Sequence, residues 1–155
     1  MTDKPFFPLY IDLSGRDILF VGGGSIAARR IGVLQPFAEQ ITVVAPEADG
    51  SIIELTETGE VSWITREFDE GDLEGRDIVF AATDDKELNA DIAAKCRERG
   101  ILVNVSSDKE LCDFYFPGIV MQGETVVGVS ASGQDHKKAR RVRERIQDIL
   151  TEEGI

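Results

Sequence analysis

The chain has 155 residues, an ordinary hydrophobic share of 42% and a formal net charge of −12. This acidity argues against a nucleic acid or an anionic membrane as partner, because both would repel it. Its apolar runs are far shorter than the ~20 residues of a membrane span, and its first residues lack a signal-peptide pattern, so a cytoplasmic location is expected. The single histidine excludes a histidine-rich metal site within one chain, and the two cysteines are expected to be free thiols.

Strands and helices are predicted to alternate up to Val105. Short apolar runs predict strands at 17–21, 40–46, 61–65, 78–83 and 101–105. Helices are predicted between them, from Ser25 to about 35, from a Ser51 cap to about 59, and from an Asp84 cap to a C-terminal glycine at Gly100. This order predicts an α/β fold with a Rossmann-like, doubly wound parallel sheet.

The alternation of strands and helices ends after Val105. Two extended segments with a turn at Gln122-Gly123-Glu124 predict a hairpin, and a helix is expected from about Asp135 to about Leu150. We therefore assign residues 1–112 to a dinucleotide-binding Rossmann domain and residues 113–155 to a small hairpin-plus-helix extension.

The stretch VGGGSIAARR joins the first strand to the first helix and carries the pattern G-x-G-x-x-A. Gly22 would permit the tight turn, and Gly24 would let a pyrophosphate approach the backbone. The amides near Ser25 and Ile26 would receive the phosphates. The alternative is a glycine turn kept for packing alone, but a strand before it and a helix after it favour dinucleotide binding.

The end of the second strand bears on the choice of dinucleotide. An NAD-binding domain usually has an acidic residue here for the ribose hydroxyls. This chain has Ala45 and Pro46 there, with Glu47 slightly beyond, so the ribose would meet backbone groups or Glu47. No arginine is placed here to bind the 2′-phosphate of NADP, which favours NAD, although the distinction from NADP stays open.

Polar residues follow the next two strands at the same edge of the sheet. Thr83 is a candidate contact for the ribose or nicotinamide, although the AATDD loop also suits a plain helix cap. Asn104 has a side chain suited to bonding a carboxamide. Ser107 and Asp108 are candidates for proton transfer. Ser-Ser-Asp is also a sequence that favours turns, and for Asp108 we favour the turn role.

These motifs together resemble the precorrin-2 dehydrogenase family, the NAD-dependent module of siroheme synthase. AATDD and NVSSDKELCDFYFP carry most of the likeness, which extends over nearly the whole chain. The resemblance implies a homodimer, held together partly by the extension, that uses NAD⁺ to oxidise precorrin-2 to sirohydrochlorin in siroheme biosynthesis. Some members also insert iron. The family's cofactor contacts correspond to Ser25, Ile26, Pro46, Glu47, Thr83 and Asn104.

Two departures from the family pattern concern proton transfer. The family commonly reads N-V-x-D-D-x-E-L-C, and its first Asp, the usual acid/base residue, corresponds to Ser107 here. A carboxylate role would shift to Asp108, and iron insertion is less expected because it must deprotonate pyrrole nitrogens. His136 stands where the family often has Ser-Pro, and is either a substitute proton carrier or, as we favour, a surface residue at a helix start.

The last predicted helix is basic in an otherwise acidic chain, because residues 137–145 hold six of the 17 lysines and arginines. The family resemblance favours Lys137, Arg140 and Arg141 as contacts for precorrin-2, a polycarboxylate. The alternative is a solvated helix. Two other functions also remain open: an NAD-sensing module without catalysis, and a tetrapyrrole chelatase or carrier without redox activity.

Overall fold

The computed structural model describes residues 4–154 and divides the chain into two compact units. The first, which we call the sheet unit, runs from Tyr10 to Phe114. The second, the hairpin unit, combines the N-terminal segment up to Leu9 with the residues from Tyr115 onward. Each unit has its own secondary structure and is described separately.

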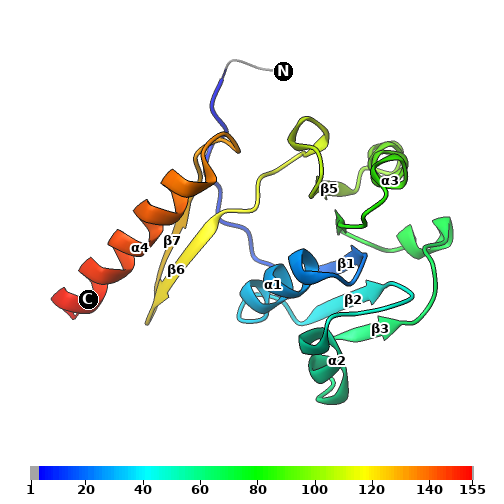
Figure 1. Ribbon diagram of the computed structural model, residues 1–155, viewed down its shortest axis with the longest axis horizontal. Coiled ribbons are helices and arrows are strands. Elements are labelled where there is room, and N and C mark those ends of the chain that lie inside the picture. The colour runs from blue at the N-terminus through cyan, green and yellow to red at the C-terminus, as the bar shows by residue number, and fades with distance from the viewer. Residues whose placement is uncertain (1–3, 155) are drawn as a thin grey trace. The chain divides into compact units, whose positions relative to one another are not determined.

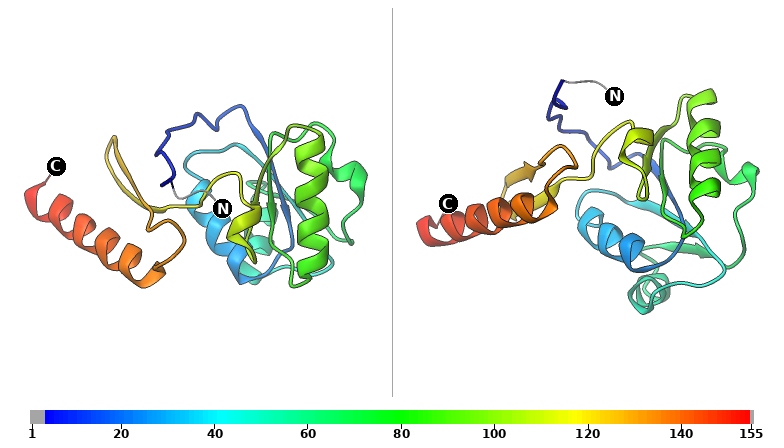
Figure 2. Two further views of the ribbon diagram at one scale, coloured as in Figure 1. Left: turned by 90° about the horizontal axis from the view of Figure 1, so that it is seen from above. Right: turned by 45° about the horizontal axis from the view of Figure 1, so that its top comes forward.

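The sheet unit is built on five parallel strands in the order β3-β2-β1-β4-β5 (Figure 1). The strands are β1 (Asp17–Val21), β2 (Gln40–Val44), β3 (Ser62–Ile64), β4 (Ile78–Ala81) and β5 (Leu102–Val105). The helices that connect them are α1 (Ser25–Leu34), α2 (Gly50–Glu57) and α3 (Lys86–Glu98). Helices α1 and α3 lie on opposite faces of the sheet (Figure 2), so the predicted doubly wound Rossmann-like fold is confirmed.

The two central strands form the core because both of their faces are covered. Every residue of β4, and every residue of β1 except Asp17, is buried, as expected for the continuous apolar runs of a parallel sheet. The rings of Phe20 and Phe80, which are direct neighbours on these strands, stack with their centroids 4.4 Å apart. Helix α3 adds its inner face to this core, with Ile92 and Cys96 fully buried.

Two of the predicted helix caps are wrong. Asp49, not Ser51, caps α2, and its carboxylate accepts hydrogen bonds from the Ser51 amide and hydroxyl. Asp85, not Asp84, caps α3 by accepting the amides of residues 87 and 88. Gly100 follows the end of α3 with a φ of +70°, so the predicted C-terminal glycine is confirmed.

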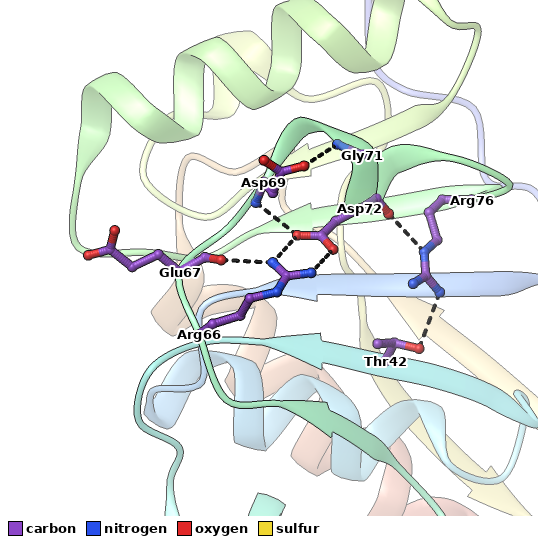
Figure 3. A network of polar contacts seen from close by, with 7 residues as sticks. All are labelled: Thr42, Arg66, Glu67, Asp69, Gly71, Asp72 and Arg76. Atoms are coloured by element: carbon purple, nitrogen blue, oxygen red, sulfur yellow. Dashed lines mark hydrogen bonds and ion pairs between the residues drawn. The ribbon is translucent and has the colours of Figure 1, made fainter.

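The acidic loop before β4, residues 68–77, contains a short 3₁₀ helix, η1 (Glu70–Leu73). Arg66 donates two hydrogen bonds to the Asp72 carboxylate, at 2.6 and 2.8 Å, and the Asp69 amide donates a third at 2.8 Å (Figure 3). Arg76 contacts the Asp72 carbonyl and the Thr42 hydroxyl on β2. These bonds connect the acidic loop to the sheet through a charged, internally paired network.

The hairpin unit contains the predicted hairpin and helix. Strands β6 (Gly118–Gln122) and β7 (Thr125–Val129) are antiparallel, and Gly123 takes the positive φ of +57° between them. Helix α4 (His136–Glu153) is capped by the Asp135 carboxylate. The Gln122 side chain on β6 donates to the Leu150 carbonyl of α4 at 2.9 Å, which joins the hairpin to the helix.

We predict that Asp72→Asn lowers the free energy of unfolding by about 1–3 kcal/mol, because hydrogen bonds to a largely buried carboxylate are lost. The Arg66 hydrogen bonds hold the pKa of Asp72 below its ordinary value, so this stabilisation is present above about pH 4 and disappears as the pH falls through the folded-state pKa. Urea unfolding at neutral and acidic pH measures it. Glu70→Gln, which loses exposed ion pairs with Lys95 and Arg99, is the control and should change stability less. An equal effect of both substitutions would contradict the prediction.

Candidate dinucleotide site and the neighbouring loops

The carboxyl ends of β1 and β4 lie side by side at the centre of the sheet. The chain leaves β1 toward α1 on one face and leaves β4 toward α3 on the other. In open α/β sheets, ligands bind at this point, where the strand order reverses. The glycine turn after Val21 and the loop after Ala81 therefore form the candidate site.

Gly22 makes the close approach between these two loops. Its φ is +104°, and a Cβ atom at this position would lie 2.4 Å from the Ala82 carbonyl oxygen. Its amide also donates to the Val44 carbonyl at 3.0 Å, so the turn contacts both strands that flank β1. Any side chain at this position would force the loops apart.

Gly23 connects the turn to the loop after β2, a role that the sequence pattern did not indicate. Its carbonyl accepts the Asp49 amide at 2.7 Å, and a Cβ atom here would lie 2.7 Å from the Glu47 carbonyl oxygen. This packing places the loop that carries Pro46 and Glu47 next to the glycine turn, with both residues exposed. They lie beside the turn, as required of candidate ribose contacts.

The surroundings of Gly24 fit an anionic group. Gly24 is the N-cap of α1, no side chain caps the helix, and the first turn contains no acidic residue. A Cβ atom at Gly24 would meet nothing within 4 Å. Ser25 and Ile26 are exposed at the same helix start. The free amides and the open space are what the pyrophosphate of a dinucleotide requires, so these residues fit the cofactor.

Thr83 is held in place by hydrogen bonds on the neighbouring loop. Its hydroxyl lies 2.6 Å from the side-chain oxygen of Asn89 and 3.0 Å from the Asp85 carbonyl. Asn89 is fully buried in α3 and also reaches the Ser107 hydroxyl at 3.1 Å. Sequence reasoning missed Asn89 because nothing in its local pattern distinguishes it from an ordinary helix residue.

Asn104 is buried, and both ends of its amide have protein partners. Arg30 on α1 donates to the amide oxygen at 2.7 Å, and the amide nitrogen donates to the Phe114 carbonyl at 2.8 Å. Arg30 also lies over the Phe80 ring at 5.9 Å, and burial lowers the pKa of its guanidinium. A cofactor contact through Asn104 stays a prediction.

Ser107 and Asp108 are both exposed where the chain leaves β5. Asp108 caps the short 3₁₀ helix η2 (Lys109–Leu111), with one carboxylate oxygen accepting the Glu110 amide at 2.9 Å. The turn role favoured from the sequence is therefore present, and the exposed carboxylate leaves the proton-transfer role open as a prediction.

The thiol groups are poor nucleophiles. Cys96 and Cys112 are free, as expected. Burial raises the pKa of Cys96 to about 11 and also raises the pKa of Cys112. Both thiols are therefore protonated near neutral pH. Within residues 4–154, no three His, Cys, Asp or Glu side chains gather as a metal site would require.

The remaining predicted residues belong to the hairpin unit. His136 is the first residue of α4 and is exposed. Lys137, Arg140 and Arg141 line a surface depression of ≈ 410 Å³ on the same helix, together with the acidic Asp135 and Glu144. Arg140 is paired with Glu144 at 2.8 Å, whereas Lys137 and Arg141 form no ion pair with any described residue. No helix among the described residues is both long and apolar enough to cross a membrane.

Comparison with known proteins agrees with this geometry. Residues 9–118 match the model of a family described as putative NAD(P)-binding. The chain belongs to this family. The glycine turn at the sheet's switch point is thus part of a nicotinamide-dinucleotide-binding fold, while the choice between NAD and NADP is not decided by this match.

Similar proteins confirm the resemblance inferred from the motifs. Over 94% of its length the chain is 38% identical to a siroheme synthase of Methylococcus capsulatus and 39% identical to siroheme synthase 2 of Yersinia pestis. It spans only 31% of the length of these relatives. A solved structure of SirC, a precorrin-2 dehydrogenase, is 28% identical with a TM-score of 0.76, covering 92% of this chain and 70% of SirC.

We predict that alanine at Gly22 impairs folding, whereas alanine at Gly24 impairs dinucleotide binding. Gly22→Ala should lower the free energy of unfolding by more than about 1 kcal/mol because of its positive φ and the Ala82 carbonyl. Gly24→Ala should keep a near-native unfolding transition but weaken NADH binding at least about tenfold, since its methyl group fills the space for the phosphates. Urea unfolding and NADH fluorescence titration measure these effects. Unchanged NADH affinity in Gly24→Ala would contradict the phosphate assignment.

Proposed function

We propose that the chain is an NAD-dependent precorrin-2 dehydrogenase, which forms sirohydrochlorin in the cytoplasmic synthesis of siroheme. The observation that carries this proposal is the open glycine turn at the same edge of the sheet as the exposed Ser107–Asp108 loop. The likeness to SirC and to siroheme synthases supports the choice of substrate.

The proposed reaction removes one hydride and one proton from precorrin-2. NAD⁺ supplies the hydride acceptor when bound. The protein must hold the dinucleotide, receive or pass on the proton, and bind the carboxylates of the macrocycle. Of these tasks, the first falls to the glycine turn with Ser25, Ile26, Thr83 and Asn104.

NAD is favoured over NADP by the loop after β2. Glu47 is an exposed carboxylate beside the glycine turn, where it would accept hydrogen bonds from ribose hydroxyls. The same negative charge would repel a 2′-phosphate. Pro46 would border the same ribose without offering a donor for a phosphate.

The exposed carboxylate of Asp108 is the proposed proton acceptor. One of its oxygens accepts the Glu110 amide, and the carboxylate remains accessible at the surface of the loop. Ser107 would hydrogen-bond the substrate instead of ionising, and His136 is the alternative proton carrier. Iron insertion is left out of the proposal, because Ser107 stands where the family's usual acid is found.

The cations of α4 are proposed to bind the substrate's carboxylates. Lys137 and Arg141 are exposed and free of ion pairs among residues 4–154, so they can neutralise an anionic ligand without first breaking a contact. Arg140 contributes less because Glu144 already pairs with it. A homodimer held partly by the hairpin unit also belongs to the proposal and is tested by the mass in solution.

The direct test is formation of NADH by the purified chain supplied with NAD⁺ and precorrin-2. We expect turnover with NAD⁺ and much less with NADP⁺. If the chain binds NADH but shows neither turnover nor tetrapyrrole binding, it is a sensing module instead. Metal insertion into sirohydrochlorin without any need for NAD would indicate a chelatase, and either result would overturn the proposal.

We predict that Asp108→Asn lowers kcat at least about 100-fold, the usual range for loss of a general base. Asparagine is as good an N-cap as aspartate, so η2 and the unfolding transition should be preserved. NADH affinity should also be unchanged. Steady-state NADH formation, with Asp69→Asn at the cap of the 3₁₀ helix η1 as the matched control, provides the measurement. Wild-type kcat in Asp108→Asn would remove Asp108 from the mechanism.

We predict that Arg141→Gln raises the KM for precorrin-2 several-fold with little change in kcat, because it removes a free cation that contacts the ground state and transition state equally. Arg140→Gln, which removes the same charge from an existing pair with Glu144, should have a smaller effect. Steady-state kinetics at low and high salt compare the two variants. A KM that is unchanged in Arg141→Gln at low salt would show that the helix does not bind substrate.

A further inference from the structure

The side chain of Asn89 uses its full hydrogen-bonding capacity within two loops. Its oxygen accepts the Thr83 amide at 3.2 Å and the Thr83 hydroxyl at 2.6 Å. Its nitrogen donates to the Thr83 carbonyl at 3.0 Å and to the Ser107 hydroxyl at 3.1 Å. Asn89 itself is 0% exposed. A side-chain amide offers two donors and two acceptor sites, and all four are occupied here.

The backbone of Thr83 fixes which way this amide points. The Thr83 amide group can only donate, and its carbonyl can only accept, so the oxygen and nitrogen of Asn89 cannot exchange places. The second hydrogen on the Asn89 nitrogen therefore faces Ser107, whose oxygen must accept it. The polarity of the whole network follows from one backbone unit.

This polarity determines what each hydroxyl can offer to a ligand. The Ser107 oxygen accepts from Asn89, so the Ser107 proton is directed elsewhere and is available for donation. The Thr83 proton is used by Asn89 at 2.6 Å or by the Asp85 carbonyl at 3.0 Å. The Thr83 oxygen also accepts the Asp85 amide at 3.2 Å, which leaves it one lone pair. Thr83 would thus meet a ligand as an acceptor through that lone pair, and Ser107 would meet it as a donor.

Asn89 also joins two loops that follow neighbouring strands. Thr83 comes two residues after the end of β4, and Ser107 comes two residues after the end of β5. The Ser106 amide and hydroxyl add bonds to the Ala81 carbonyl, at 3.0 and 3.2 Å. The loop with the candidate cofactor contact is therefore held against the loop with the candidate proton acceptor.

We propose that Asn89 is a positioning residue, which orients the hydroxyls of Thr83 and Ser107 and sets the distance between the cofactor and the proton acceptor. This inference rests on the proposed dehydrogenase function. Because it is fully buried, Asn89 would not reach a ligand itself, and it would act through the Thr83 backbone and the hydroxyls of Thr83 and Ser107.

Two substitutions of Asn89 test this role in the full chain. Asn89→Ala removes all four bonds, and we expect kcat for NADH formation to fall about 10- to 100-fold, as for a small misplacement of reacting groups. Asn89→Asp keeps the two acceptors but loses both donors. Since burial raises the pKa of a carboxyl group, protonation should restore one donor and recover part of kcat as the pH falls. Asn89→Ala should show no such recovery.

A control separates positioning from simple loss of stability. Ile92→Val shortens a fully buried side chain on the same helix and removes none of the four Asn89 bonds, so it should weaken folding but leave kcat unchanged. Equal kcat in Asn89→Ala and the wild type, measured on folded protein, would overturn the proposal, and so would identical pH profiles of the two Asn89 variants.

Failure of the dehydrogenase proposal can be distinguished from failure of the Asn89 proposal. If the wild type binds NADH but does not oxidise precorrin-2, the dehydrogenase proposal fails. NADH titration then decides the Thr83 part of the inference. A loss of NADH affinity of at least about threefold in Asn89→Ala, but not in Ile92→Val, would support the orientation of Thr83. Unchanged affinity would overturn it.

Discussion

The close approach of Gly22 to the end of β4 is the constraint on which the candidate site depends. A side chain at Gly22 would overlap the Ala82 carbonyl, so the two loops can meet only because Gly22 has none. With the loops in contact, the start of α1 lies at the same edge of the sheet as Thr83. The geometry of the candidate site therefore follows from the packing of the backbone and does not depend on polar side chains.

The neighbouring glycines, Gly23 and Gly24, have different structural roles. Gly23 packs against the loop after β2 and brings Glu47 toward the turn, whereas Gly24 faces open space. One glycine therefore serves the β1–β4 contact, one serves the β1–β2 contact, and one leaves room for a ligand. The motif pattern marks only the first and the third, because the contact of Gly23 lies outside the motif.

Features fixed by neighbours in sequence could be predicted, and features fixed by distant contacts could not. The central strands and the hairpin follow from apolar runs and turn residues, so they were predicted correctly. The caps of α2 and α3 were misplaced by one or two residues, because each helix start depends on loop contacts such as that between Asp49 and Gly23. The bond between Arg30 and Asn104 joins residues 74 positions apart, and no local pattern indicates it.

The Asn89 network also explains how serine can stand at position 107. The buried amide of Asn89 needs an acceptor there, because an unsatisfied buried donor costs about 1–3 kcal/mol. Aspartate, which the motif resemblance implies at this position, and serine both supply an oxygen, whereas an apolar residue would not. The replacement therefore leaves the network satisfied while removing the ionisable group. Since the chain continues directly into an exposed Asp108, a carboxylate remains one residue away, outside the Asn89 network.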